Sequence, residues 1–286
     1  MVNRAALHED SSRQADPGIS AEHLNAWRDR FLGWQGDDPD RVLASFTIVA
    51  DLTVLPRECS FAGDSRMLVA RYDGLPFAAV AFSNANLEGN GEDARRLARL
   101  THRLIPSKET FICLVAERQW RLLQDAYDVL RVREEWQMVF PVDGGTQVET
   151  SAVPLESSSL AQMRDLARRE GMRAFELSPL AKGPWYGIWR DGHLVAQGGT
   201  HLSLERFAEI GNIVTAPGYR RQGYASQVVS SLTREHRRHG RRVFIQVLKQ
   251  NRNAVAFYKH MGFETVRTMF LTQCRLARSS RSTAGL

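Results

Sequence analysis

FAEIGNIVTAPGYRRQGYASQVV, residues 207–229, is the stretch that decides the fold. Its apolar and β-branched residues predict a strand over 206–215, which runs into the turn APG at 216–218. Beyond the turn, apolar residues recur at i, i+3, i+4 and i+7, the spacing of one helical face. These residues are Ala225, Val228, Val229 and Leu232. The sequence therefore predicts a strand, a glycine-bearing loop and a helix in succession.

The loop at 220–225, RRQGYA, is suited to an anion. A loop that enters a helix offers unpaired backbone N–H groups and the positive end of the helix dipole, and together these bind a pyrophosphate. Gly223 lets the backbone come close to such a ligand, and Arg220 and Arg221 add positive charge for phosphate oxygens. Glycine also precedes helices in plain turns, so the loop alone does not specify a ligand.

Strand and helix patterns alternate along the rest of the chain. In the first half we expect a helix at 20–34 capped by Ser20, strands at 46–55 and 67–82, the second folded at Asp73-Gly74, a helix at 94–104, a strand at 110–116, a helix at 120–130 and a strand at 135–140. In the second half we expect a helix at 159–170, a hairpin at 185–200, a strand at 243–247, a helix at 254–261 and a strand at 266–276.

The same order of elements appears twice, which predicts a tandem repeat of one α/β unit. Val243 lies 133 positions after Thr110, and Tyr258 lies 131 positions after Tyr127. The turn DGGT at 143–146 is the best linker between the two units.

A second motif, NRNAVAFYKHMGF, occupies 251–263. Together with 207–229 it resembles the GNAT superfamily of acyl-CoA N-acyltransferases, whose cofactor loop [QR]xxGx[GA] matches RRQGYA. The similarity covers about residues 150–276, and the first half resembles the same fold in degraded form. The resemblance implies an α/β (α+β) chain of two GNAT-like domains in tandem. Each is a mixed, mostly antiparallel sheet with a splayed parallel strand pair, flanked by helices.

We expect the chain to divide into a flexible leader at 1–19, a degenerate GNAT-like domain at 20–142, a catalytic GNAT domain at 147–278 and a flexible tail at 279–286. In the first repeat, the loop NLEGNG at 86–91 keeps its glycines but begins with Asn86 in place of a basic residue. Glu88, Glu92 and Asp93 crowd this loop and would repel a pyrophosphate. Arg131 also stands where Gly262 stands in the second repeat. The first domain is therefore expected to be structural, to wall the substrate cleft and to bind no CoA.

The resemblance implies acetyl-CoA (coenzyme A) as acyl donor, bound where the strands at 206–215 and 243–247 splay apart. By matching position, the backbone near Ile213 and Val214 holds the pantetheine arm and the thioester, and Asn251 reaches the pantetheine amides. The loop and helix start hold the pyrophosphate. They contribute Arg220, Arg221, Gln222, Gly223, Tyr224, Ala225 and Ser226.

Acyl transfer to an amine needs a base for the amine and an acid for the leaving thiolate. Tyr258 falls on the general-acid tyrosine of the family, although it also fits the apolar face of its helix. Glu209 lies fourteen positions before Gly223, the spacing of the glutamate base in the histone acetyltransferase branch. Its alternatives are an ordinary strand glutamate with water as the base, or His201 as a weaker candidate.

The composition is that of a soluble globular protein, with 286 residues of which 43% are hydrophobic and 24% charged. No stretch reaches the about eighteen apolar residues of a membrane-spanning helix, and the polar first residues lack the apolar core of a signal peptide. Cys59, Cys113 and Cys274 form no CxxC pair. We therefore expect a cytoplasmic protein without metal, redox chemistry or a membrane partner.

Three functions fit these patterns. The first is an N-acetyltransferase that moves an acetyl, or another short acyl, group from acetyl-CoA to an amine by direct attack in a ternary complex. A small-molecule acceptor is favoured over a protein acceptor, and the oligomeric state stays open. The second is a CoA-responsive binding protein without turnover. The third is a nucleic-acid binder, since the net charge is +6 and HRRHGRR occupies 236–242. That run lacks interleaved aromatic residues for base stacking, so we expect no nucleic-acid partner.

Overall fold

The structure is a computed structural model that describes residues 19–37, 39–45, 52, 59–75, 77–84, 89–172, 175 and 179–277. The expected leader at 1–19, except Ile19, lies outside these residues, as does the expected strand at 46–55, except Leu52. The expected tail at 279–286 also lies outside them.

The first unit runs from α1 to β5. It contains α1 (Ala21–Asp37), α2 (Pro39–Ala44), β1 (Cys59–Gly63), β2 (Met67–Tyr72), β3 (Ala79–Asn84), α4 (Gly91–Leu104), β4 (Thr110–Ala116), α5 (Glu117–Ala126) and β5 (Tyr127–Val139). The second unit runs from β6 to β11. It contains β6 (Val153–Pro154), η2 (Ser157–Ser159), α6 (Leu160–Arg169), η3 (Pro179–Lys182), β7 (Trp185–Arg190), β8 (His193–Ser203), β9 (Phe207–Thr215), η4 (Pro217–Tyr219), α7 (Tyr224–Arg238), β10 (Arg242–Leu248), α8 (Arg252–His260) and β11 (Glu264–Leu276).

Within the described residues, the strands form one sheet in the order β1-β2-β3-β4-β11-β5-β10-β9-β8-β7-β6. Each unit holds one parallel pair, β3 with β4 and β9 with β10. A helix makes the crossover in each case, α4 in the first unit and α7 in the second, as parallel strands require. The predicted tandem arrangement of mixed, mostly antiparallel sheets is confirmed.

The parallel pair of the second unit separates soon after it begins. β9 pairs with β10 only from Phe207 to Glu209, although β9 continues to Thr215. The last residues of β9 therefore have β8 on one side and no strand on the other among the residues described. This is the predicted splay.

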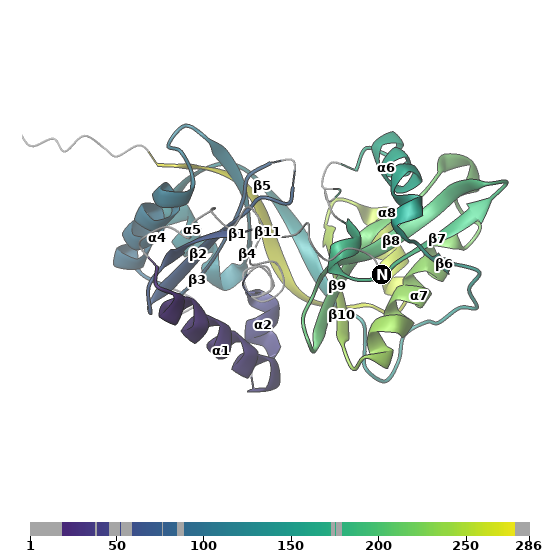
Figure 1. Cartoon of the computed structure of the whole chain (residues 1–286), viewed down its shortest axis with the longest axis horizontal. Coiled ribbons are helices and arrows are strands. Elements are labelled where there is room, and N and C mark those ends of the chain that lie inside the picture. Colours follow the sequence, from purple (N-terminus) through teal and green to yellow (C-terminus); the bar gives the residue numbers. More distant parts are fainter. Residues whose placement is uncertain are drawn as a thin grey trace, which may run out of the picture.

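The last strand of each unit lies beside strands of the other unit. β11 pairs with β4 of the first unit along Met269–Arg275 and with β5 along Glu264–Leu276. β5 in turn pairs with β10 of the second unit. Figure 1 shows β5 and β11 in the middle of the molecule, between the two groups of helices. Neither unit therefore completes its sheet with its own last strand alone.

The predicted helix at 120–130 is wrong beyond Ala126, where α5 ends. Tyr127 begins β5 instead, and its ring packs edge-on against Phe111 with its hydroxyl 2.6 Å from Thr101 Oγ1. Tyr127 is therefore not the counterpart of Tyr258, which lies in α8. Arg131 likewise lies in a strand and does not correspond to Gly262. The spacing of apolar residues predicted too long a helix, because Leu130, the last residue of that pattern, is 47% exposed and belongs to no helical face.

Helices pack on both faces of the sheet. Trp27 and Phe31 of α1 lie in one buried cluster with Phe207 and Phe244 of the second unit. Val228 of α7 lies in a different cluster, on the face of Ile245. The predicted cap of α1 is present, since Ser20 Oγ accepts the His23 N–H at 3.2 Å.

Among the helices that the structure describes, none is both long and apolar enough to cross a membrane.

Cutting the chain between Asp143 and Gly144 should leave the two pieces associated, because β11 pairs with β4 and β5 of the other piece. A protease site inserted there, in an exposed turn, allows the cut to be made on the folded protein. We expect the cleaved pieces to elute together in size-exclusion chromatography in native buffer and apart in denaturant. The uncut insertion variant is the control, and separation in native buffer would contradict the strand arrangement.

Candidate active site

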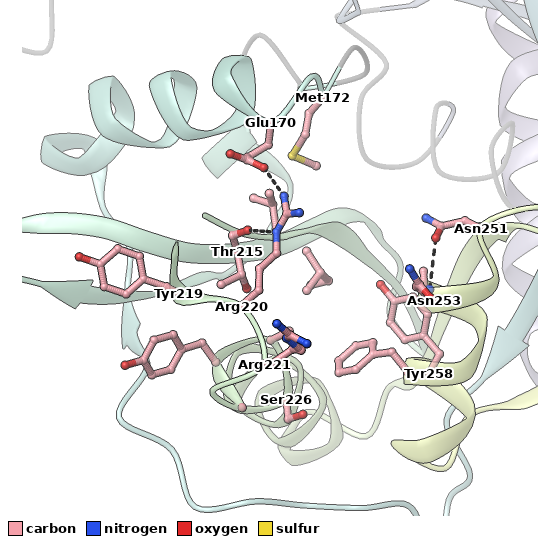
Figure 2. Close-up of a pocket in the computed structure, with 17 residues that line it drawn as sticks. Glu170, Met172, Thr215, Tyr219, Arg220, Arg221, Ser226, Asn251, Asn253 and Tyr258 are labelled. Atoms are coloured by element: carbon pink, nitrogen blue, oxygen red, sulfur yellow. Dashed lines mark hydrogen bonds and ion pairs between the residues drawn. The ribbon is translucent and has the colours of Figure 1, made fainter. Parts of the chain in front are cut away.

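A pocket of about 670 Å³ opens where β9 and β10 separate (Figure 2). Its walls come from the end of β9, the loop after η4, the start of α7 and the start of α8. Ten of the twelve predicted site residues line it. They are Ile213, Val214, Arg220, Arg221, Gly223, Tyr224, Ala225, Ser226, Asn251 and Tyr258. The other two, Gln222 and Glu209, do not line it.

The start of α7 is left open toward the pocket. Its N-cap is Gly223, with a left-handed φ of 78°, and no side chain in the described chain caps the helix. A Cβ at this position would meet no atom within 4 Å, so the backbone conformation and not crowding favours glycine. The first N–H groups of α7 are therefore free of side-chain acceptors and lie at the positive end of the helix.

The corresponding helix start in the first unit is closed. Asn90 caps α4, and its Oδ1 accepts the N–H groups of Glu92 at 3.0 Å and Asp93 at 3.1 Å. A Cβ at Gly89 would lie 2.9 Å from the Leu122 side chain of α5, so this turn is also tightly packed. Asn86 and Glu88, which the sequence placed in this loop, lie outside the described residues. The two units thus differ at the start of the crossover helix. The first N–H groups of α4 are capped by Asn90, whereas those of α7 face the pocket.

The two arginines of the loop differ in their surroundings. Arg220 donates from Nε to the Thr215 carbonyl at 3.0 Å and forms an ion pair with Glu170 (Figure 2). Its guanidinium therefore ties the loop to the end of β9 and to the segment after α6. Arg221 is exposed and forms no ion pair within the described chain, which leaves its charge available. Sequence analysis missed Glu170 and Met172, which line the pocket from a segment without a motif.

Tyr258 combines a packed ring with a hydroxyl at the pocket. The ring lies edge-on to Phe257 and Phe263, with centroids 5.1 Å and 5.4 Å away, and the residue is 8% exposed. Burial raises the pKa of the phenol well above its ordinary value. The hydroxyl therefore keeps its proton at neutral pH, and both expectations for this residue, packing and proton donation, are compatible with its position.

Asn251 and Gln222 are engaged in local contacts. Asn251 Oδ1 caps α8 by accepting the Ala254 N–H at 3.2 Å, which leaves its amide nitrogen toward the pocket that the residue lines. Gln222 Nε2 turns back to the Gly218 carbonyl at 3.4 Å. Gln222 is thus a residue of the loop itself and not of the pocket wall.

Glu209 lies on β9, four positions before the pocket-lining Ile213, and is 8% exposed. Its Oε1 is 3.8 Å from Nδ1 of His201 on β8. Glu135 on β5 belongs to the same surroundings: burial raises its pKa to about 7, and the charge of Glu209 contributes to the rise. Sequence analysis missed Glu135 because it comes from the first unit. Its position follows only from the pairing of β5 with β10.

The described residues hold no group of three or more His, Cys, Asp or Glu side chains placed to bind a metal ion.

Residues 154–263 match the model of the acetyltransferase (GNAT) family. Curated proteins give no significant match to the chain.

Several solved structures are similar in fold. An acetyltransferase of the GNAT family from Novosphingobium aromaticivorans is 21% identical, covers 73% of this chain and 89% of its own, and gives a TM-score of 0.57. A Drosophila protein is 15% identical over 90% of this chain and 97% of its own, with a TM-score of 0.62. The tandem GNAT protein from the clavulanic acid biosynthesis pathway is 14% identical over 92% of this chain and 97% of its own, with a TM-score of 0.61.

Replacing Glu135 with glutamine should change how stability depends on pH. The pKa of Glu135 rises from 4.5 to about 7 on folding, because of burial and then Glu209, opposed by His201 and Arg133. The folded state therefore binds the proton more tightly, and the contribution of the protonated group is complete below pH 4.5 and lost as the pH rises through 7.

We expect Glu135→Gln to raise the Tm relative to the unmodified chain at pH 8 and to leave it nearly unchanged at pH 5, measured by thermal unfolding. Glu264→Gln, which removes an exposed strand carboxylate, is the control. An equal Tm difference at both pH values would contradict the assignment.

Proposed function

Because residues 154–263 form a domain of the GNAT acetyltransferase family, we propose that the chain transfers an acetyl, or another short acyl, group from acetyl-CoA to an amine. The observation that carries this proposal is the pocket in which the uncapped start of α7 and the hydroxyl-bearing Tyr258 face the same space. The likeness to solved structures supports the fold alone, so substrate and mechanism rest on these residues.

The helix start would hold the pyrophosphate of CoA. Backbone N–H groups at Gly223, Tyr224 and Ala225 point from the helix end, and an anion there gains from the dipole. The exposed guanidinium of Arg221 would add a charge-assisted contact. Arg220 has a different proposed role, since its bonds to Thr215 and Glu170 hold the loop in place.

The end of β9 would hold the pantetheine arm. Ile213 and Val214 line the pocket on the side of β9 that has no strand partner in the part of the chain described. Their backbone groups are thus available to the amides of an extended ligand. The Asn251 amide nitrogen lies across the pocket on the α8 side.

The chemistry needs one proton acceptor and one proton donor. The thioester supplies an acyl group whose carbonyl carbon accepts the amine. Tyr258, kept protonated by burial, would give its proton to the departing sulfur. Glu209 would take a proton from the amine, directly or through water, from its buried position four residues before the pocket wall.

The first unit would bind no CoA, because Asn90 already occupies the first N–H groups of α4.

A nucleic-acid function receives little support from the basic run at 236–242. His236 is fully buried, and burial lowers its pKa to about 4. Arg237 and Arg241 donate to the carbonyls of Val142 and Leu204. These side chains therefore stabilise the fold of this chain and are engaged in contacts within it.

Acetyl-CoA at about a hundred times its Kd should stabilise the fold by roughly 2.7 kcal/mol, because a ligand that binds only the folded state shifts the equilibrium. Gly223→Asp should abolish this effect by placing a carboxylate against the pyrophosphate. The measurement is thermal unfolding with and without acetyl-CoA.

Gly192→Asp is the matched control, since Gly192 also has a left-handed φ, 75°, and open space around it, in the β7–β8 turn. Equal stabilisation of Gly223→Asp and Gly192→Asp would refute the pyrophosphate assignment.

Tyr258→Phe should lower kcat by about 10²-fold, the lower range for a general acid, while acetyl-CoA still stabilises the fold. Turnover is followed by release of free CoA thiol. Tyr127→Phe removes the hydroxyl of a buried tyrosine in the first unit and should leave kcat unchanged.

Normal turnover in Tyr258→Phe would mean that water protonates the sulfur. Acetyl-CoA binding without turnover of any amine in the unmodified chain would favour a CoA-responsive binding protein.

A further inference from the structure

Two carboxylates from different units share one face of the sheet. Glu209 on β9 pairs with Phe244 on β10, and Phe244 pairs with Val139 on β5. Cross-strand partners point to the same face, and so do residues four apart on one strand. Glu135 lies four residues before Val139, so its side chain is on the face of Glu209. This is the face opposite α7.

Among the residues that the structure describes, neither carboxylate has a hydrogen-bond donor. Glu209 is buried, and its one close polar neighbour in the described chain is His201, at 3.8 Å. Glu135 accepts no hydrogen bond and forms no ion pair within the same part of the chain. The ring of His201 lies directly over Gly211 of β9, where an added Cβ would come within 2.8 Å of the ring. Glu135 is half-buried and the Glu209 side chain is 11% exposed, so both carboxylates are largely shielded from water yet remain open to a cationic donor that the described residues do not supply.

A buried amide on the same face adds to the surplus of acceptors. Gln137 lies between Glu135 and Val139 and is fully buried. Its Nε2 donates to the Leu43 carbonyl at 3.1 Å, and this bond fixes which end of the amide is the oxygen. Its Oε1 has no hydrogen-bond partner among the residues described. This face therefore holds oxygen acceptors that require N–H groups.

The other charged groups on this face do not neutralise the pair. Arg133 lies two residues before Glu135 on β5, and Arg267 of β11 pairs with Gln137. Neither arginine forms an ion pair with Glu135 or Glu209 in the described chain. Arg242 of β10 is also on this face, since it pairs with Phe207 and lies over its ring, and it forms no ion pair with either carboxylate in the described chain. His201 and Arg133 are the positive groups whose charge acts on Glu135.

We propose that Glu135 of the first unit and Glu209 of the second form the acceptor subsite, which binds the ammonium group of a basic amine and receives its protons. This inference rests on the proposed acyl transfer and specifies its acceptor. The amine would reach the thioester from the face of α1 and α2, while Tyr258 acts from the face of α7. A neutral alcohol of the same shape would bind this subsite less well, because it lacks the positive charge and the N–H groups of an ammonium.

The proton balance assigns a role to each group. The ammonium gives one proton to the carboxylate pair, and its nitrogen then forms the new bond to the acyl carbon. The carbon–sulfur bond breaks, and the sulfur takes a proton from Tyr258. A second proton leaves the nitrogen through the carboxylate pair to solvent, and Tyr258 regains a proton from solvent, so the amide keeps one N–H. The net products are amide, thiol and one proton released to solvent.

The raised pKa of Glu135, about 7, supports this role. Near neutral pH, such a group changes its protonation state with little free-energy difference. An arriving cation would favour the doubly ionised pair, and departure of the neutral amide would favour reprotonation.

The test uses the full chain, acetyl-CoA and matched acceptors, namely phenethylamine, hexylamine and spermidine against phenethyl alcohol and hexanol, with thiol release as readout. We expect the amines and not the alcohols to be acylated. Glu135→Gln should raise the KM for the amine about tenfold or more, because a charged hydrogen bond is lost. It should also move the acidic limb of the kcat/KM profile to lower pH, since one negative charge fewer lies beside Glu209.

Two variants separate this role from a structural one. Glu134→Gln removes the adjacent exposed carboxylate, which points to the other face of β5, and should change neither the KM nor the pH profile. Glu135→Asp keeps the charge and should recover part of the amine KM. Unchanged amine KM and pH profile in Glu135→Gln, equal use of alcohols, or acylation of no amine by a chain that acetyl-CoA stabilises would each overturn the inference.

A binding measurement without turnover separates the two proposals. Phenethylamine is titrated calorimetrically into the unmodified chain and into Glu135→Gln, in the absence of acetyl-CoA. Tighter binding to the unmodified chain supports the subsite even if acetyl-CoA does not stabilise the fold, in which case only the proposed function fails. Equal or undetectable binding to both chains contradicts the subsite, whatever acetyl-CoA does.

Discussion

The backbone pairing of β5 and β11 is the constraint on which the rest of the structure depends. β11 satisfies N–H and C=O groups on both of its edges, with β4 on one side and β5 on the other, and β5 does the same between β11 and β10. Buried backbone groups must be paired, so neither unit can move away without exposing unpaired strands. This pairing makes one sheet from two units and carries Glu135 to the strands of the second unit. The arrangement of the face that carries Glu135 and Glu209 therefore depends on strand pairing between the two units.

The pocket itself depends on pairing that ends early. After Glu209, the edge of β9 that faces β10 has no partner strand in the described chain, while its other edge continues along β8 to Thr215. Backbone groups are thus presented to a ligand without disrupting the sheet. The start of α7 is similar, because its first N–H groups have no side-chain acceptor in the described chain and are available to a ligand.

Local sequence patterns were sufficient for what depends on neighbours in the chain. The strand, loop and helix of residues 207–229 and the Ser20 cap follow from local spacing. The ten pocket-lining residues follow from the resemblance of the two motifs to the GNAT family. The patterns failed at Tyr127, because apolar residues spaced to Leu130 fit a helix while long-range pairing makes the segment a strand. They also missed Glu135 and Glu170. No local signal marks either residue, since one reaches its place through another unit's strand and the other through an ion pair with Arg220.

The contrast between Asn90 and Gly223 has a consequence for how duplicated units diverge. A side-chain cap of the kind Asn90 provides is worth about 1 kcal/mol relative to alanine, but glycine at the same position costs only about a few tenths of a kcal/mol. Leaving the start of a crossover helix open to a ligand is therefore cheap, and closing it takes one substitution with little change in stability. After one copy of a duplicated unit retained the ligand, the other copy could lose its open helix start without harm to the fold. The first unit would then persist for the strand that it lends to its neighbour.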